Sequence, residues 1–356
     1  MAASFTFEPV DDGISVGGPV SLALDRAGNP RIAFSQQGSG QIIVATRNGG
    51  AWTLDNVPGA FAPASGGLRL AIDSKGDPQI AFLELSSGEL VHAVKSAGRW
   101  SSAHIPTRLT PDHQPGGVGA IDFALHPGRL DTQSRDVGYF AYVDLASQRI
   151  GFAHTAGVGP TPVLVEDQPH NTTEFAGPSA AFDPSENFFI AYVGVFASGA
   201  AQASVSVRSK HIVDIEKGTF SNPPTIVDGS QSLNVRTQTS IVRTFSDGCV
   251  VYFDMASKTL KASVSDLSGL SAIETVAANL ANIVSPSAAA KQDEFRVAYG
   301  DADAMMLPSR SKSGDWTVEA VEAVSGGPPS LAYDNASTAN IAYAAGARLR
   351  YARRAE

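Results

Sequence analysis

Short apolar runs, separated by turns rich in Gly, Pro, Asn and Asp, follow one another along the chain. The first clear group comprises residues 21–25, 32–34 and 42–46 and a segment that begins at Trp52. Apolar runs of about 4–8 residues bounded by such turns predict β-strands rather than helices. The group therefore predicts four short strands joined by tight turns.

One tripeptide of this group recurs seven times, at spacings of 44 to 60 residues. Its copies are Ile32-Ala-Phe34, Ile80-Ala-Phe82, Phe140-Ala-Tyr142, Ile190-Ala-Tyr192, Val250-Val-Tyr252, Val297-Ala-Tyr299 and Ile341-Ala-Tyr343. Four strands per repeat at this spacing are typical of the blades of a β-propeller. A large β-sandwich is the alternative, but it would need seven coincidental matches. We therefore predict an all-β fold, a seven-bladed β-propeller of four-stranded antiparallel blades.

The predicted propeller is a single domain over residues 1–356, and the two ends of the chain meet in one blade. The last repeat stops after a third strand at 349–353, whereas residues 5–10 resemble the fourth strand of other repeats, such as 52–57. The N-terminal strand is therefore expected to complete the last blade. The expected blades span residues 18–57, 66–106, 118–166, 176–228, 236–277, 284–322, and 326–354 together with 4–10.

A turn precedes Trp in three repeats, most clearly in Lys95-Ser-Ala-Gly-Arg-Trp100 and Lys312-Ser-Gly-Asp-Trp316. This turn resembles a degenerate Asp-box, the BNR repeat of sialidases and related propellers. The likeness covers only the turn, and the Asp of the box is missing. No arginine triad with a Tyr/Glu pair accompanies it, so the resemblance implies the fold and not sialidase activity. We expect the Trp side chains to fill gaps between blades.

Asp25, Asp73, Asp183 and Asp334 each end the first strand of a repeat and are expected to bond the following turn. The position four residues earlier should face the central channel. A buried charge there needs a partner, so Arg69 and Asp122 in blades 2 and 3 predict either a structural salt bridge or an anion-binding Arg69 beside an orienting or acid–base Asp122. The channel column reads Ser21, Arg69, Asp122, Ser179, Thr239, Ser287 and Ser330.

The loops that lead into blades 3, 4 and 5 are long and polar, and loops on a rigid scaffold often carry function. They contain His113, His170 and Arg236. Because histidine titrates near neutral pH, His113 and His170 are the candidates for proton transfer, with Arg236 as a substrate contact. The alternative is that all three are solvated loop residues.

Carboxylates follow the second strands at the same predicted face. We expect Glu84, Asp144 and Asp254 to reach the channel mouth and contact a substrate, the alternative being solvated turn residues. The sequence contains no motif for a nucleotide, a metal or another cofactor, so none is expected.

Charge and composition narrow the possible partners. The net charge is −9 and no basic tract stands out, so neither nucleic acid nor an anionic membrane is expected as a partner. The single cysteine, Cys249, excludes internal disulfides. No apolar run reaches about 18 residues and no signal peptide is visible, so a cytoplasmic location is expected. A closed ring of blades needs no partner, so a monomer is expected, although the sequence leaves the oligomeric state open.

Three classes of function remain open. The first is an enzyme with one active site at the channel mouth, using acid–base chemistry of the lyase, hydrolase or cyclase type on an anionic or polyhydroxylated small molecule or glycan. The second is a lectin-like propeller that binds a glycan or small ligand, and the third is a protein-interaction scaffold. A lectin should repeat its pocket in several blades, whereas the departures from the repeat gather in one sector and favour a single site.

Overall fold

The computed structural model describes most of the chain. The described residues are 4–10, 13–62, 67–84, 86–105, 118–130, 136–144, 149–156, 163–164, 172–196, 202–215, 225–229, 238–244, 247–266, 269–281, 285–291, 294–311, 313–324 and 326–355.

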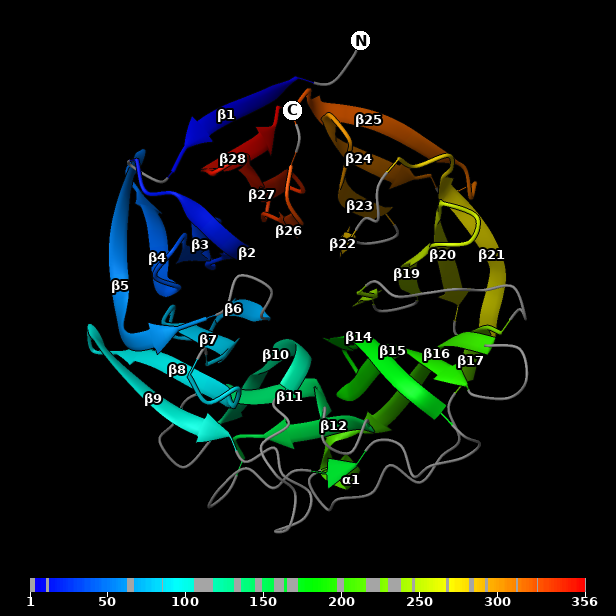
Figure 1. Cartoon of the computed structure of the whole chain (residues 1–356), viewed down its shortest axis with the longest axis horizontal. Helices are drawn as coiled ribbons and strands as arrows, with labels where there is room; N and C mark the ends of the chain where they lie inside the picture. The colour runs from blue at the N-terminus through cyan, green and yellow to red at the C-terminus, as the bar shows by residue number, and fades with distance from the viewer. Residues whose placement is uncertain are drawn as a thin grey trace.

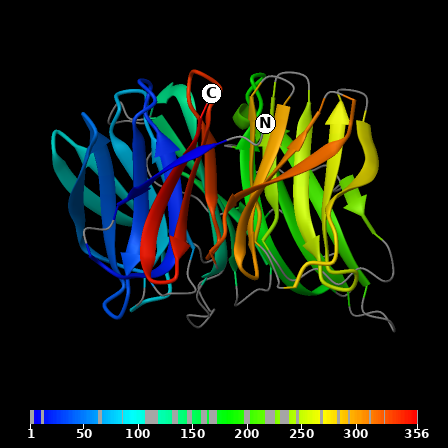
Figure 2. The ribbon, with the colours of Figure 1, turned by 90° about the horizontal axis from the view of Figure 1, so that it is seen from above.

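The described residues form seven four-stranded antiparallel sheets arranged as a ring (Figure 1). The first strand of each sheet contacts the first strands of both neighbouring sheets, which closes the ring around a central axis. Figure 2 shows the ring edge-on, with the strands running between its two faces. This arrangement confirms the predicted seven-bladed propeller.

The first four blades have these strands in order from the axis outward. Blade 1 contains β2 (Val16–Leu24), β3 (Pro30–Gln36), β4 (Gln41–Asn48) and β5 (Ala51–Phe61). Blade 2 contains β6 (Leu68–Ile72), β7 (Pro78–Leu83), β8 (Leu90–Ser96) and β9 (Arg99–Ile105). Blade 3 contains β10 (Val118–Leu130), β11 (Asp136–Asp144), β12 (Arg149–His154) and β13 (Val163–Leu164). Blade 4 contains β14 (Thr172–Phe182), β15 (Asn187–Phe196), β16 (Gln202–His211) and β17 (Thr225–Asp228), with α1 (Ile212–Ile215) between the last two.

The remaining three blades follow the same order. Blade 5 contains β18 (Ser240–Arg243), β19 (Gly248–Asp254), β20 (Thr259–Asp266) and β21 (Gly269–Ala277). Blade 6 contains β22 (Ser287–Lys291), β23 (Glu294–Asp301), β24 (Ala304–Arg310) and β25 (Trp316–Glu322). Blade 7 contains β26 (Ser330–Tyr333), β27 (Ala339–Ala345), β28 (Arg348–Arg354) and the N-terminal strand β1 (Phe5–Pro9).

The second strand of each blade explains why the tripeptide is so apolar. Its two faces both pack against neighbouring blades, so alternation between apolar and polar residues disappears. Every residue of β7, β11 and β19 is buried. The hydrophobic core is accordingly divided into seven clusters among the described residues, one between each pair of neighbouring blades.

The predicted role of the turn aspartates is confirmed. Oδ1 of Asp73 accepts hydrogen bonds from the N–H groups of Lys75, at 2.9 Å, and Asp77, at 2.8 Å. Asp25, Asp183 and Asp334 bond their turns in the same way. Gly76 in this turn has a φ of +88°, a conformation that a glycine adopts without steric cost.

The N-terminal strand completes the seventh blade, as predicted. β1 pairs with β28 in antiparallel register, from Phe5 opposite Arg354 to Pro9 opposite Arg350. The pairing covers the edge of β28, which would otherwise offer unpaired backbone groups to other chains.

The tryptophans join neighbouring blades through a repeated polar contact, which we call the outer joint. In each case the Trp of an outer strand lies opposite or beside a Lys or Arg of the third strand, and both contact a carboxylate on the outer strand of the preceding blade. Trp52 and Arg47 bond Glu8. Trp100 and Lys95 bond Asp55, and Trp316 and Arg310 bond Glu274. The sequence indicated that the Trp side chains lie between blades but not which carboxylates they bond.

Candidate functional site

The innermost strands are joined by a ring of hydrogen bonds through the channel column. A serine hydroxyl in one blade accepts a hydrogen bond from a backbone N–H group in the next blade, which fixes the spacing of the strands around the axis. The pairs are Ser21 with Leu70 at 2.9 Å, Ser240 with Ala288 at 2.8 Å, Ser287 with Leu331 at 3.0 Å and Ser330 with Leu22 at 2.9 Å.

The structure corrects one member of the predicted column. Ser240, not Thr239, lies opposite the central residue of the tripeptide in blade 5, where its register partner is Val251. The turn after this strand is one residue shorter than in blade 1, since Thr244 N–H bonds Asp247 O whereas Asp25 N–H bonds Asn29 O. Counting back from the usual turn length therefore points to the wrong neighbour.

Two charged residues interrupt the serine ring at the boundary between blades 2 and 3. Arg69 lies on β6 and Asp122 on β10, and the guanidinium Nε donates to Oδ1 of the carboxylate at 2.6 Å. Arg69 Nη1 also donates to Leu68 O at 3.0 Å. The second carboxylate oxygen of Asp122 accepts the N–H of Ala180 in blade 4 at 2.7 Å. Asp122 thus occupies the acceptor place that serines fill in other blades, while Arg69 has no acceptor to offer.

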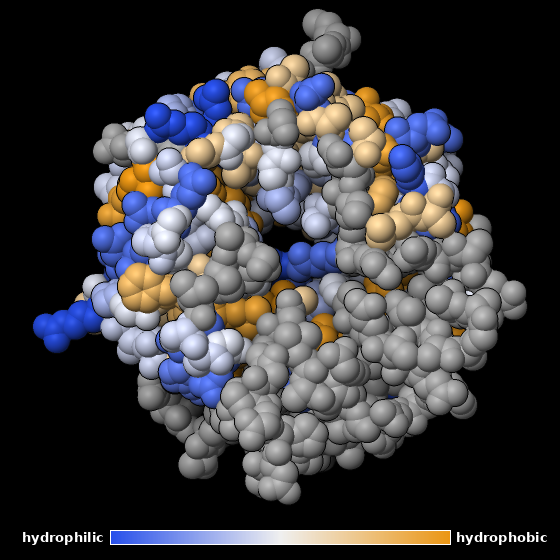
Figure 3. All heavy atoms as spheres, in the orientation of Figure 1, coloured by the Kyte–Doolittle hydropathy of each residue, from blue (hydrophilic) through white to orange (hydrophobic). Residues whose placement is uncertain are grey.

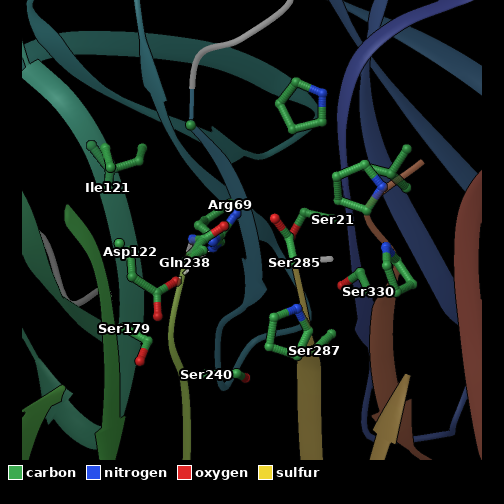
Figure 4. A pocket seen from close by; sticks show the side chains of 18 of the residues that line it. Ser21, Arg69, Ile121, Asp122, Ser179, Gln238, Ser240, Ser285, Ser287 and Ser330 are labelled. Carbon is green, nitrogen blue, oxygen red and sulfur yellow. Dashed lines mark hydrogen bonds and ion pairs between the residues drawn. The ribbon is translucent and has the colours of Figure 1, made fainter. Parts of the chain in front are cut away.

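These residues surround a cavity of about 880 Å³ on the axis of the ring. Figure 3 shows the face of the molecule hollowed at its centre, and Figure 4 shows Arg69, Asp122 and several serines around the same space. Among the described residues that line the cavity, Arg69 and Asp122 are the only charged ones. The rest of the described lining is mainly serine, proline, glycine and aliphatic residues from all seven blades.

The three predicted carboxylates do not line this cavity. Glu84 accepts a hydrogen bond from Ser87 at 2.7 Å in the turn after β7, and Asp144 is buried at the end of β11. Asp254 is buried and bonds Ser257 and Lys261 at 2.7 and 2.8 Å. Burial alone would raise the pKa of Asp254, but those hydrogen bonds outweigh it and hold the pKa below its ordinary value. The structure therefore does not bring these residues to Arg69 and Asp122, and their contact with a substrate stays a prediction.

The predicted loop residues His113, His170 and Arg236 lie outside the described residues. The described histidines do not line the cavity. His92, for example, is buried between blades 2 and 3, where its Nε2 bonds Gln79 at 2.9 Å and its ring lies against Phe123 and Phe140.

The described site therefore suits binding better than proton transfer. Asp122 is the only carboxylate among the described lining residues, and each of its oxygens already accepts a hydrogen bond. Arg69 carries a permanent positive charge and keeps donors for a ligand. A group that moves a proton would have to come from another part of the chain.

Neither a metal site nor a membrane helix is found in the described part of the chain. No three His, Cys, Asp or Glu residues within the described ranges are grouped so that they could hold a metal ion. No helix among the described residues has the length and hydropathy needed to cross a lipid bilayer.

Known proteins resemble the chain in structure and not in sequence. No protein-family model and no curated protein matches it. A streptogramin B lyase has a TM-score of 0.56 and 13% identity, with 99% of this chain and 98% of that chain covered. Virginiamycin B lyase from Staphylococcus aureus has a TM-score of 0.56 and 10% identity, with 98% and 99% covered.

A lectin shares the architecture as well. A mutant of Aleuria aurantia lectin, in complex with Fucα1-6GlcNAc, has a TM-score of 0.53 and 11% identity, with 87% of this chain and 98% of that chain covered. At these identities the likeness establishes the class of protein, a β-propeller, and nothing finer. Propellers of this shape include both lyases and fucose-binding lectins.

Proposed function

We propose that this propeller is a single-site protein that binds a small anionic or polyhydroxylated molecule in the central cavity and acts on it by acid–base chemistry. The observation that carries the binding part of the proposal is the Arg69–Asp122 pair, at 2.6 Å, in a cavity whose other described lining residues are uncharged. Ligand sites are typically concave spaces of about 300–1,000 Å³ with a few convergent polar groups, and the cavity of about 880 Å³ falls in this range.

Proton transfer is assigned to His113 or His170. Their segments lead into β10 and β14, the strands that carry Asp122 and Ser179 at the cavity. Arg69 would bind a carboxylate or stabilise a developing oxyanion, and a loop histidine would move the proton. The existence of lyases with this architecture supports the reaction type by analogy only.

Ligand screening followed by substitution tests the proposal. A panel of metabolites and glycans is screened by thermal shift, because a ligand that binds the native state raises the melting temperature. Products of the ligands that bind are then sought by mass spectrometry. We expect Arg69→Gln to weaken binding at least tenfold, and His113→Ala combined with His170→Ala to abolish turnover while ligand binding is retained. Arg310→Gln, which breaks an ion pair in an outer joint, is the control for unspecific loss of stability.

Stoichiometry separates this proposal from a lectin with repeated pockets. One ligand per chain, with binding lost in Arg69→Gln, fits a single cavity on the axis. Several equivalent ligands per chain, bound independently of Arg69, would reject the central site and favour the lectin. Turnover that survives the loss of both histidines would reject the assigned proton-transfer residues.

A further inference from the structure

Most N–H groups of the Arg69 guanidinium form no hydrogen bond with a described residue. A guanidinium has five N–H groups, and the structure uses one on Nε for Asp122 and one on Nη1 for Leu68 O. Neither N–H of Nη2 bonds a described residue, and the side chain is 24% exposed. The guanidinium therefore presents free donors to the cavity, and its planar fork matches the two oxygens of a carboxylate or phosphate group.

The carboxylate of Asp122 does not occupy the remaining N–H groups of Arg69. Both oxygens of Asp122 already accept hydrogen bonds, one from Arg69 and one from the Ala180 N–H. The pair thus anchors the Nε edge of the guanidinium to blade 3 and, through Ala180, to blade 4. The two N–H groups of Nη2 remain available for a ligand.

Four serines extend the donor surface around the axis. The hydroxyl oxygens of Ser21, Ser240, Ser287 and Ser330 accept backbone N–H groups, whereas their protons bond no described residue. Each hydroxyl therefore keeps one proton to donate to an acceptor in the cavity. We call these four serines and Arg69 the collar.

We propose that the ligand of the collar is an organic oxyanion with several further acceptor oxygens, such as a sugar acid or a sugar phosphate. Arg69 holds the charged group, and the serines donate to the other oxygens. A cavity of about 880 Å³ is far larger than an inorganic ion requires, which is why the ligand is an organic molecule. This inference rests on the proposed central-cavity function and narrows the class of its ligand.

Matched sugars test the inference. Glucuronate and glucose 6-phosphate carry the two kinds of oxyanion, glucose is their neutral counterpart, and glucosamine reverses the charge. Binding to the full chain is measured by isothermal titration calorimetry at constant ionic strength, because charge pairs weaken as salt increases. We expect at least one of the two anions to bind tenfold or more tighter than glucose, and glucosamine to bind weakest. The preferred anion then identifies the carboxylate or the phosphate class.

Variants connect this preference to the collar. Arg69→Gln should abolish the difference in affinity between the anion and glucose. Arg310→Gln, which is remote from the cavity, should leave this difference unchanged. Ser287→Ala should weaken the anion and glucose by a similar factor, because it removes a neutral donor. Melting curves without ligand show whether each variant is folded.

Two outcomes overturn the inference without touching the proposed central site. They are glucose binding as tightly as both anions, and an Arg69→Gln variant that keeps the preference for the anion. Failure of all four probes to bind the native chain also overturns the inference, and the wider panel described above then decides the proposed function separately.

Discussion

A single missing donor distinguishes one outer joint from the other three. Between blades 6 and 7, Arg354 and Glu319 take the places of the cation and the carboxylate, but Phe5 stands where the other joints have Trp. Oε1 of Glu319 is buried and has no hydrogen-bond partner among the described residues. The Arg354 Nε lies 3.3 Å from the other carboxylate oxygen, also without a well-formed hydrogen bond. The indole N–H that bonds the carboxylate elsewhere is what this joint lacks.

Phe5→Trp should therefore stabilise the protein. A buried acceptor without a partner costs about 1–3 kcal/mol, and an indole Nε1 at this position would supply the donor. We expect the free energy of unfolding, measured with urea, to rise by about 1 kcal/mol. The reverse change, Trp52→Phe, removes the indole donor to Glu8 in a complete joint and should lower the free energy of unfolding. A loss of stability in Phe5→Trp would show that the indole does not reach Glu319.

Strands of neighbouring blades are joined by more than one layer of hydrogen bonds. Two of the tripeptide tyrosines form a middle layer, in which Tyr252 donates to Asp228 at 2.6 Å and Tyr343 donates to Glu322. In both cases the carboxylate closes the outer strand of the preceding blade. The described contacts between blades thus lie in three layers, the serine ring at the axis, these tyrosines in the middle and the outer joints at the periphery, although one pair of blades need not have all three.

The N-terminal strand contributes to two of these junctions at once. β1 pairs with β28, and its Glu8 bonds Arg47 at 2.7 and 2.8 Å and Trp52 at 3.0 Å in blade 1. Deletion of residues 1–10 should therefore lower the free energy of unfolding by on the order of 3 kcal/mol or more and expose the edge of β28. Calorimetry measures the shift in melting temperature. Glu8→Gln, which keeps the strand, should cost less, and an unchanged melt after deletion would argue against closure by β1.

At the scale of the whole molecule, the sequence was sufficient for the fold because the repeat lies in its most buried strands. Burial on both faces keeps the tripeptide apolar in every blade, so seven copies remain visible. The neighbouring positions of Arg69 and Asp122 could be predicted in the same way. The predicted channel-facing residue of blade 5 was wrong, and Ser240 takes its place, because a shorter turn changes the register without changing the apolar pattern.

The sequence could not show how far from the axis of the ring the three predicted carboxylates lie. Periodicity assigns Glu84, Asp144 and Asp254 to the face where second strands end, but these strands lie one position outside the axis. Contacts within their own blades then occupy both residues, with Ser87 bonding Glu84 and with Ser257 and Lys261 bonding Asp254. The partners of the Trp side chains were equally hidden, since they come from the outer strand of another repeat.

Carboxylates in three different parts of the ring make its stability depend on pH. Burial alone would raise the pKa of Glu274, but hydrogen bonds from Arg310 and Trp316 outweigh it, so the pKa lies below its ordinary value. Burial would also raise the pKa of Asp254, but hydrogen bonds from Lys261 and Ser257 lower it below its ordinary value. The pKa of Asp334 is lowered in the same way, by hydrogen bonds from Thr338 and Arg353. Asp77 acts in the opposite sense, because burial and the charge of Asp73 raise its pKa.

A carboxylate whose pKa is lowered in the folded state stabilises that state above its unfolded pKa, near 4. This contribution is lost as the pH falls through the folded pKa. We therefore expect the free energy of unfolding to be nearly constant from pH 7 to 5 and to decrease steadily below about pH 4.5. Glu274→Gln should lower it by about 1–3 kcal/mol at pH 7 and make the decrease in acid shallower, since one of the three groups no longer titrates. Urea titrations of both proteins at pH 7, 5, 4 and 3 compare the two curves, and parallel curves would show that the Glu274 joint does not couple protonation to the stability of the ring.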